Sequence, residues 1–126
     1  MSFARRWAEG YRVAWEAGDP GAAAALYAPD CVFHSAPFRE PERPLDYTRR
    51  VFPEATAEDV RFGEPVEEGD RAAVEWWAVL VTPDGEEQAL AGCSILRFDE
   101  AGLVVEARDY WQLEPGRREP PPGWGR

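Results

Sequence analysis

The order of secondary-structure signals along the chain most limits its fold, because helical patterns come first and strand patterns follow. Phe3, Trp7, Tyr11 and Trp15 recur every fourth residue, which places four aromatic side chains on one face of an N-terminal helix. From Val60 onward the chain alternates β-rich segments with short turns. Strands grouped after helices indicate an α+β fold rather than an alternating α/β fold.

Capping residues predict where the helices begin and end. Ser2 is a suitable N-cap, and Gly18 suits the position that follows a helix. Asp19 and Pro20 then begin a second, alanine-rich helix over residues 21–27, since aspartate caps and proline fits the first helical position. A third helix is expected over residues 44–52.

Five segments have the composition of strands: residues 31–36, 60–67, 72–81, 88–98 and 103–113. Pro65 predicts that the second of these is an edge or bulged strand. The elements together predict a curved antiparallel sheet with three helices on one face and a cavity between them. Residues 1–114 are expected to form one domain, followed by a Pro- and Gly-rich tail over residues 115–126.

Missing residue types exclude several kinds of active site. All fourteen basic residues are arginine, so lysine Schiff-base chemistry, attachment of pyridoxal phosphate and a P-loop lysine are excluded. The single histidine, His34, is too few for the usual catalytic zinc sites. Cys31 and Cys93 lack metal-ligand spacing and are expected to be free and structural. We therefore expect no metal and no cofactor.

Charge and hydropathy limit the partners and the location. A net charge of −10 argues against nucleic acid or an anionic membrane as the main partner. No apolar run approaches the ~20 residues of a transmembrane helix. The N-terminus has charge at Arg5 and Arg6 but no apolar region like that of a signal peptide, which predicts a cytoplasmic protein.

Four stretches, in this order, resemble the SnoaL-like branch of the nuclear transport factor two superfamily, which includes ketosteroid isomerase. They are residues 15–20, 26–33, 97–102 and 108–111. The resemblance implies a cystatin-like conical α+β barrel with an internal pocket, commonly a homodimer through the outer face of the sheet. It leaves the reaction open, because the superfamily holds isomerases, cyclases, dehydratases, hydrolases and non-enzymes.

The resemblance also assigns roles to single positions. The oxyanion tyrosine of ketosteroid isomerase falls on Tyr11, its general base on Ser35 and its second oxyanion acid on Ser94. A serine hydroxyl cannot act as a carboxylate base at neutral pH. The Arg-x-Asp pair of limonene epoxide hydrolase falls near the apolar Trp77, whereas its final carboxylate and an acidic residue of SnoaL fall on or near Asp109.

Asp109 is therefore the leading catalytic candidate. It lies in an apolar strand, where the two-residue period places Trp111 on the same face. A carboxyl group against Trp would have a raised pKa and could act as acid or base. The alternative is an ion pair with Arg108 or another arginine, or an exposed position at a dimer face.

His34 is the second candidate, although strand alternation prevents both it and Ser35 from facing inward unless the strand bends. A structural histidine is the alternative. Tyr11 is either a ligand donor or a core residue. Trp15, Trp77 and Trp111 are expected to line an aromatic pocket together with Ser35 and Ser94. Alternation then places Trp76 on the outer face, with Val74, Ala78, Leu80, Val104 and Tyr110, as the apolar surface of the dimer.

Two functions remain open at this point. The first is a cofactor-free enzyme that isomerises, cyclises, dehydrates or hydrolyses a hydrophobic small molecule, with Asp109 as acid or base. The second is a non-catalytic binding or dimerisation module with the same pocket. The position of Asp109 discriminates them: an enzyme needs this carboxyl inside an open cavity with a polar partner, whereas a closed pair with arginine favours the module.

Overall fold

The helices of the computed structural model, which describes residues 1–126, begin where the capping residues predict. Helix α1 (Phe3–Ala17) starts after Ser2, whose hydroxyl accepts a 3.1 Å hydrogen bond from the Arg5 amide, and it ends at Gly18 with φ of 65°. Helix α2 (Pro20–Ala24) is capped by Asp19 and is shorter than expected, because Tyr27 already belongs to the first strand.

The remaining elements are a third helix, a short 3-10 turn and six strands. They are β1 (Tyr27–His34), α3 (Pro44–Val51), η1 (Phe52–Glu54), β2 (Thr56–Phe62), β3 (Val66–Glu68), β4 (Arg71–Val81), β5 (Glu87–Phe98) and β6 (Val104–Pro115). The sheet order is β1-β6-β5-β4-β2, and β3 also pairs with β4. The predicted interruption around Pro65 is present as the break between β2 and β3.

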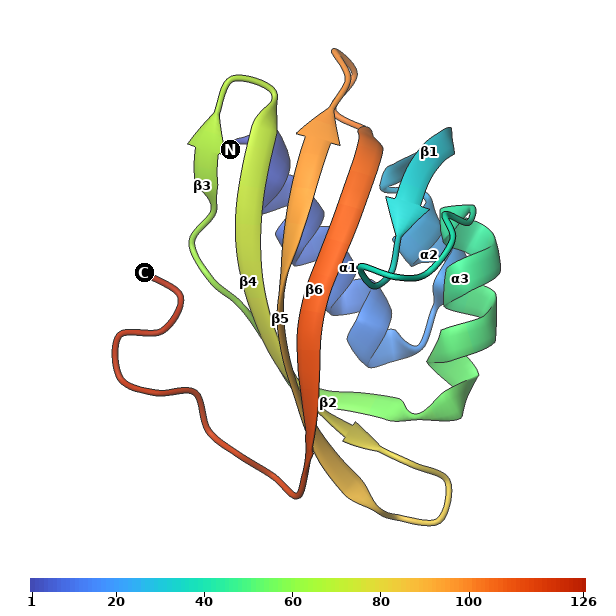
Figure 1. Ribbon diagram of the computed structural model, residues 1–126, viewed down its shortest axis with the longest axis vertical. Coiled ribbons are helices and arrows are strands. Elements are labelled where there is room, and N and C mark those ends of the chain that lie inside the picture. The colour runs from blue at the N-terminus through green and yellow to red at the C-terminus, as the bar shows by residue number, and fades with distance from the viewer.

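The α+β fold class is confirmed, with two differences in the sheet. The sheet is mixed, since β1 lies parallel to β6 while the other pairs are antiparallel. The first and last strands of the chain are far apart in sequence, so no hairpin forces them to be antiparallel. The curved sheet is also open, because β1 and β2 at the two ends of the order do not pair (Figure 1).

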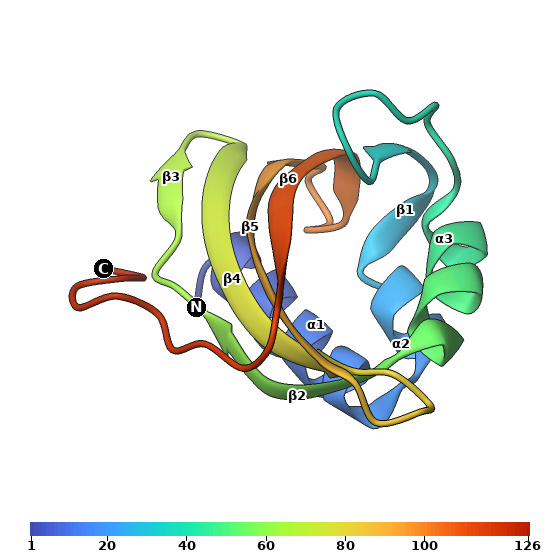
Figure 2. The ribbon, with the colours of Figure 1, turned by 60° about the horizontal axis from the view of Figure 1, so that its bottom comes forward.

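The helices cover one face of the curved sheet and define its inner side. Helix α1 packs against β2 and β4, and α3 packs against α2 and β1 (Figure 2). The aromatic face of α1 enters the core, where Trp7 meets Phe62 edge to face with ring centroids 5.5 Å apart. None of the helices has the length and hydrophobicity that a membrane-spanning segment requires.

The side chains of β4 that face the core are those expected on the outer face, and the reverse also holds. Trp76 is buried on the inner side, 6% exposed, whereas Trp77 lies on the outer side beside the C-terminal tail. Apolar residues fill both faces of this strand, so hydropathy alone does not orient it; the exposed Glu75 marks the outer face. Inner positions are Val74, Trp76, Ala78 and Leu80. Val104 is also buried inside, because a β-bulge beside it changes the alternation of β6, while Tyr110 is 46% exposed.

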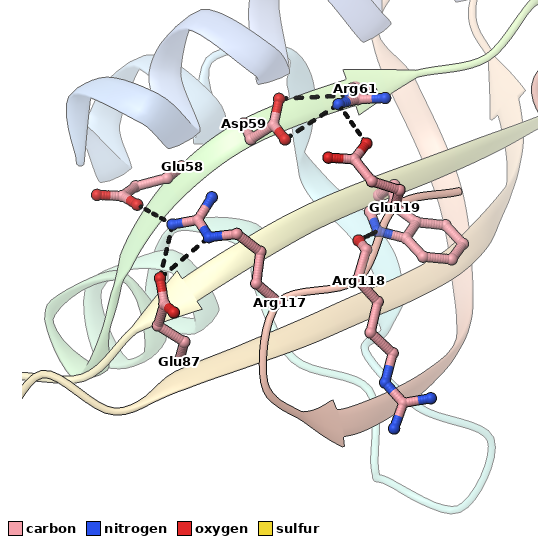
Figure 3. A network of polar contacts seen from close by, with 8 residues as sticks. Glu58, Asp59, Arg61, Glu87, Arg117, Arg118 and Glu119 are labelled. Carbon is pink, nitrogen blue, oxygen red and sulfur yellow. Dashed lines mark hydrogen bonds and ion pairs between the residues drawn. The ribbon is translucent and has the colours of Figure 1, made fainter. Parts of the chain in front are cut away.

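The C-terminal tail after β6 folds back along the outer side of β4, away from α2 and α3 (Figures 1 and 2). Arg117 bridges Glu58 and Glu87, and Glu119 pairs with Arg61 (Figure 3). The Trp77 indole donates a 2.8 Å hydrogen bond to the carbonyl of residue 118. Its ring meets that of Trp124 edge to face, and the Glu64 amide bonds the carbonyl of residue 125.

Candidate functional site

A cavity of about 840 Å³ lies between the inner face of the sheet and the helices. It is lined by 21 residues, of which 14 are hydrophobic. Aromatic rings make up much of its wall: Trp7, Tyr11, Trp15, Tyr27, Tyr47, Phe52, Phe62, Trp76 and Trp111. This volume and lining suit a hydrophobic small molecule.

Asp109 enters the cavity from β6 as part of a short hydrogen-bond chain. The β5–β6 register places Ser94 directly opposite Asp109, and the Ser94 hydroxyl donates a 2.6 Å hydrogen bond to Asp109 Oδ1. The same hydroxyl oxygen accepts a 2.9 Å hydrogen bond from Trp76 Nε1. Asp109 forms no ion pair, and its Oδ2 has no hydrogen-bond partner in the protein. One carboxylate oxygen is thus held while the other is free for a ligand.

The surroundings of Asp109 favour its uncharged form. Burial among aromatic side chains raises the pKa of Asp109 to about 7, against a smaller lowering by the Ser94 hydrogen bond. The group therefore exists in both protonation states near neutral pH. A carboxyl group in this condition can accept or donate a proton.

Three phenols share the cavity with this carboxyl group. Burial, with a further contribution from the negative charge of Asp109, raises the pKa of Tyr11, Tyr27 and Tyr47 well above the usual value. The phenols therefore stay protonated and available as hydrogen-bond donors. Trp7 also lines the cavity, and its Nε1 is a buried donor with no hydrogen-bond partner.

Arg39 provides a cation at the mouth of the cavity. It lies in the loop between β1 and α3, is exposed, and donates a 3.1 Å hydrogen bond from Nη1 to Ser35 Oγ. Its guanidinium carbon lies 5.4 Å from the centroid of the Trp111 ring. Trp111 Nε1 in turn donates a 2.7 Å hydrogen bond to the Ser35 carbonyl. Ser35 is therefore a buried support for both side chains.

Five of the predicted site residues line this cavity: Tyr11, Trp15, Ser94, Asp109 and Trp111. The other three do not. Ser35 is fully buried beside it, and His34 points the other way, with Nδ1 donating a 3.2 Å hydrogen bond to the Arg39 carbonyl. Trp77 lies on the outer face of the sheet, so the expectation that it lines the pocket is wrong. The structure does not bring His34 or Trp77 to Asp109.

Several lining residues were missed by the sequence reasoning. Tyr27 belongs to strand β1, whereas the expected helix over residues 21–27 includes it. Trp76 is expected on the outer face but lines the cavity. Tyr47 and Arg39 lie in a short helix and a loop, whose patterns carry no signal for which side chains reach a cavity.

No three His, Cys, Asp or Glu side chains converge as a metal site would require. Cys31 is free and buried, and burial raises the pKa of its thiol to about 12. Cys93 is free and partly exposed.

Comparison with known proteins supports the family assignment. A family model described as a SnoaL-like domain matches residues 4–107. A search of curated proteins finds no match to this sequence.

Solved structures of the same fold are distant in sequence. A Δ5-3-ketosteroid isomerase from Mycobacterium sp. is 19% identical with a TM-score of 0.70, covering 89% of this chain and 95% of that one. An epoxide hydrolase from M. tuberculosis, similar to limonene epoxide hydrolase, is 19% identical with a TM-score of 0.70, covering 87% and 83%. A computationally designed 17-OHP binder is 18% identical with a TM-score of 0.74, covering 94% and 100%. At these identities the likeness shows the fold alone.

Proposed function

We propose that this chain, which belongs to the SnoaL-like domain family, binds a hydrophobic small molecule and transfers a proton on it with Asp109. The observation that carries the proposal is the state of this carboxyl group inside the cavity. Oδ1 is fixed by Ser94, Oδ2 is free, and the pKa is raised to about 7. Such a group matches the acidity at which general acid–base catalysis at neutral pH is most efficient.

The polar atoms around Asp109 indicate what the ligand carries. The phenols of Tyr11 and Tyr47 and the indole N–H of Trp7 are donors without protein acceptors in the cavity wall. A buried indole N–H can only donate. We therefore propose that the ligand presents an oxygen acceptor, such as a carbonyl, ether or epoxide oxygen. These donors would stabilise negative charge on that oxygen while Asp109 moves the proton.

Substrate assays with matched variants test this proposal. The structural neighbours suggest two compound classes to try: β,γ-unsaturated ketones, including a Δ5-3-ketosteroid, and hydrophobic epoxides. On any compound that is turned over, Asp109→Asn should lower the rate at least ~100-fold, because it keeps the shape and removes the proton chemistry. Glu75→Gln removes a carboxylate on the outer face of the same sheet and should leave the rate unchanged. Unchanged turnover by Asp109→Asn would reject the assignment.

The second candidate function is non-catalytic binding in the same cavity, which the designed 17-OHP binder of this fold supports. Under this alternative a hydrophobic ligand is retained through purification and is detected by native mass spectrometry, and no compound of the panel is turned over. Asp109→Asn would then change affinity only.

We also propose a cytoplasmic homodimer, as the sequence and the family resemblance suggest. The outer face differs from the expected one, since Trp76 is inside and the tail covers part of the face near Trp77. Tyr110 and the neighbouring Cys93 remain accessible on that side of the sheet. Light scattering at micromolar concentration tests the dimer, and Tyr110→Arg should shift the measured mass toward that of a monomer. A wild-type protein that is already monomeric contradicts the proposal.

A further inference from the structure

The cation at the cavity mouth has no acidic partner. Arg39 lines the cavity and forms no ion pair. Arg50, the other arginine that lines the cavity, is neutralised by a two-point contact with Glu42. Arg39 has only the single bond to Ser35, so most of its five N–H donors are left for another group.

The position of this guanidinium group is fixed by its neighbours. Ser35 Oγ accepts a hydrogen bond from Nη1, and the guanidinium carbon lies 5.4 Å from the centroid of the Trp111 ring. The backbone at Arg39 is held as well, because its amide bonds the Ala36 carbonyl at 3.2 Å and its carbonyl accepts from His34. A planar cation fixed in this way is suited to bind a carboxylate or another oxyanion through two parallel hydrogen bonds.

We propose that Arg39 is a specificity-determining residue that binds an anionic group of the ligand, so that the preferred ligand is a hydrophobic molecule with a carboxylate or similar oxyanion at one end. The apolar body fills the aromatic cavity and the anionic end stays at the mouth. This inference rests on the proposed function, because it requires that the cavity binds a hydrophobic small molecule.

The other charged groups of the cavity allow such a ligand. The charge of Arg50 is paired with that of Glu42. The carboxylate of Glu54 also lines the cavity, but it is exposed and belongs to η1, whereas Arg39 lies in the loop between β1 and α3. Asp109 has a pKa of about 7, so about half of these groups are uncharged at neutral pH, and Asp109 opposes a nearby anion less than a fully ionised carboxylate would. Arg39 is the one unpaired cation that lines the cavity.

Two fluorescent probes with the same ring system test the proposal. Anilinonaphthalene sulfonate carries one anionic group, and anilinonaphthalene is the same molecule without it. Competition between them shows whether they share one site. Arg39→Gln should weaken binding of the sulfonate about tenfold and change binding of the neutral probe by less than about twofold. Arg39→Lys keeps the charge but loses the planar contact, and we expect an intermediate loss for the sulfonate.

Arg49→Gln is the matched control, because Arg49 is an exposed, unpaired arginine on α3 that does not line the cavity. An equal loss of both probes with Arg39→Gln, or an equal loss of the sulfonate with Arg49→Gln, would overturn the role of Arg39. If neither probe binds the wild-type protein, the proposed function fails together with this inference. If the neutral probe binds and the ratio of the two dissociation constants is the same in wild type and Arg39→Gln, only this inference fails.

Discussion

Ser94 and Asp109 are direct cross-strand partners, and the serine hydroxyl donates a 2.6 Å hydrogen bond to the carboxylate. The same hydroxyl accepts the indole N–H of Trp76, a core residue. A single side chain therefore connects the packing of β4 to the carboxyl group in the cavity. This arrangement fixes the orientation of Asp109 without a neighbouring charge that would hold it ionised.

We expect Ser94→Ala to raise the pKa of Asp109 further, because the hydrogen bond that lowers it is lost while the burial remains. The variant also leaves Trp76 Nε1 without its acceptor, which should cost about 1–3 kcal/mol of stability. Carbon-13 NMR of the aspartate carboxyl groups across a pH titration measures the first effect, and urea unfolding measures the second. Cys93→Ala, one residue away, is the control; an unchanged or lower pKa in Ser94→Ala contradicts the prediction.

The raised pKa of Asp109 predicts a dependence of stability on pH. In the unfolded chain this carboxyl loses its proton near pH 3.8, whereas in the folded protein it does so near pH 7. Between these values the folded state binds one more proton, so the free energy of unfolding falls as pH rises, by up to about 4 kcal/mol. The difference between wild type and Asp109→Asn should show this fall within the window and be constant outside it. Glu75→Gln should keep the wild-type dependence, and a flat difference for Asp109→Asn would refute the linkage.

The fold could be predicted largely from local signals. The caps at Ser2, Gly18 and Asp19 placed two helices because each satisfies a backbone group at a helix end. The parallel β1–β6 pair could not be predicted in this way, since it joins residues some seventy positions apart and no turn connects them. Local sequence patterns predict hairpins and helix ends, but they do not predict the pairing of two strands that are far apart in the sequence.

The site was predicted in part, for a related reason. The resemblance to ketosteroid isomerase points to Ser94, and the resemblance to limonene epoxide hydrolase and SnoaL, together with an apolar strand, points to Asp109. The strand register then brings the two residues together. The predicted faces of Trp76 and Trp77 are the reverse of those in the structure, because α1 covers one face of β4 and the tail covers the other, so both faces are apolar. Arg39 was missed because its role depends on the path of a loop around Ser35, which no periodicity encodes.

Gly92 should be required for the shape of the cavity wall. It lies opposite both Trp76 and Trp111, and a Cβ at this position would lie 2.4 Å from Trp76 Cη2 and 2.6 Å from the Tyr110 carbonyl oxygen. Gly92→Ala should therefore destabilise the protein by about 1–3 kcal/mol or more and weaken probe binding, because Trp76 has to move.

Gly21→Ala in α2 is the matched control, since only Asp19 Oδ1 comes within 4 Å, at 3.6 Å. There we expect no loss or a gain of about 0.5 kcal/mol. Equal thermal denaturation midpoints for both variants would show that the tight contact at Gly92 has no effect.

The last prediction concerns what holds the C-terminal tail on the sheet. Three kinds of contact do so: the exposed ion pairs of Arg117 and Glu119, the hydrogen bonds from the Trp77 indole and the Glu64 amide to tail carbonyls, and the partly buried contact between Trp124 and Trp77. Exposed ion pairs contribute about 0–1 kcal/mol and weaken with salt, whereas an aromatic contact that removes apolar surface from water contributes more and is not weakened by ionic screening. We therefore expect Trp124→Ala to cost about 1–3 kcal/mol at low and high salt alike. Arg117→Gln should cost less than Trp124→Ala, and only at low salt. Limited proteolysis with mass spectrometry gives an independent measure, because Trp124→Ala should release the tail for cleavage while Arg117→Gln leaves it protected. Faster cleavage in Arg117→Gln than in Trp124→Ala would mean that the charges, and not the indoles, hold the tail in place.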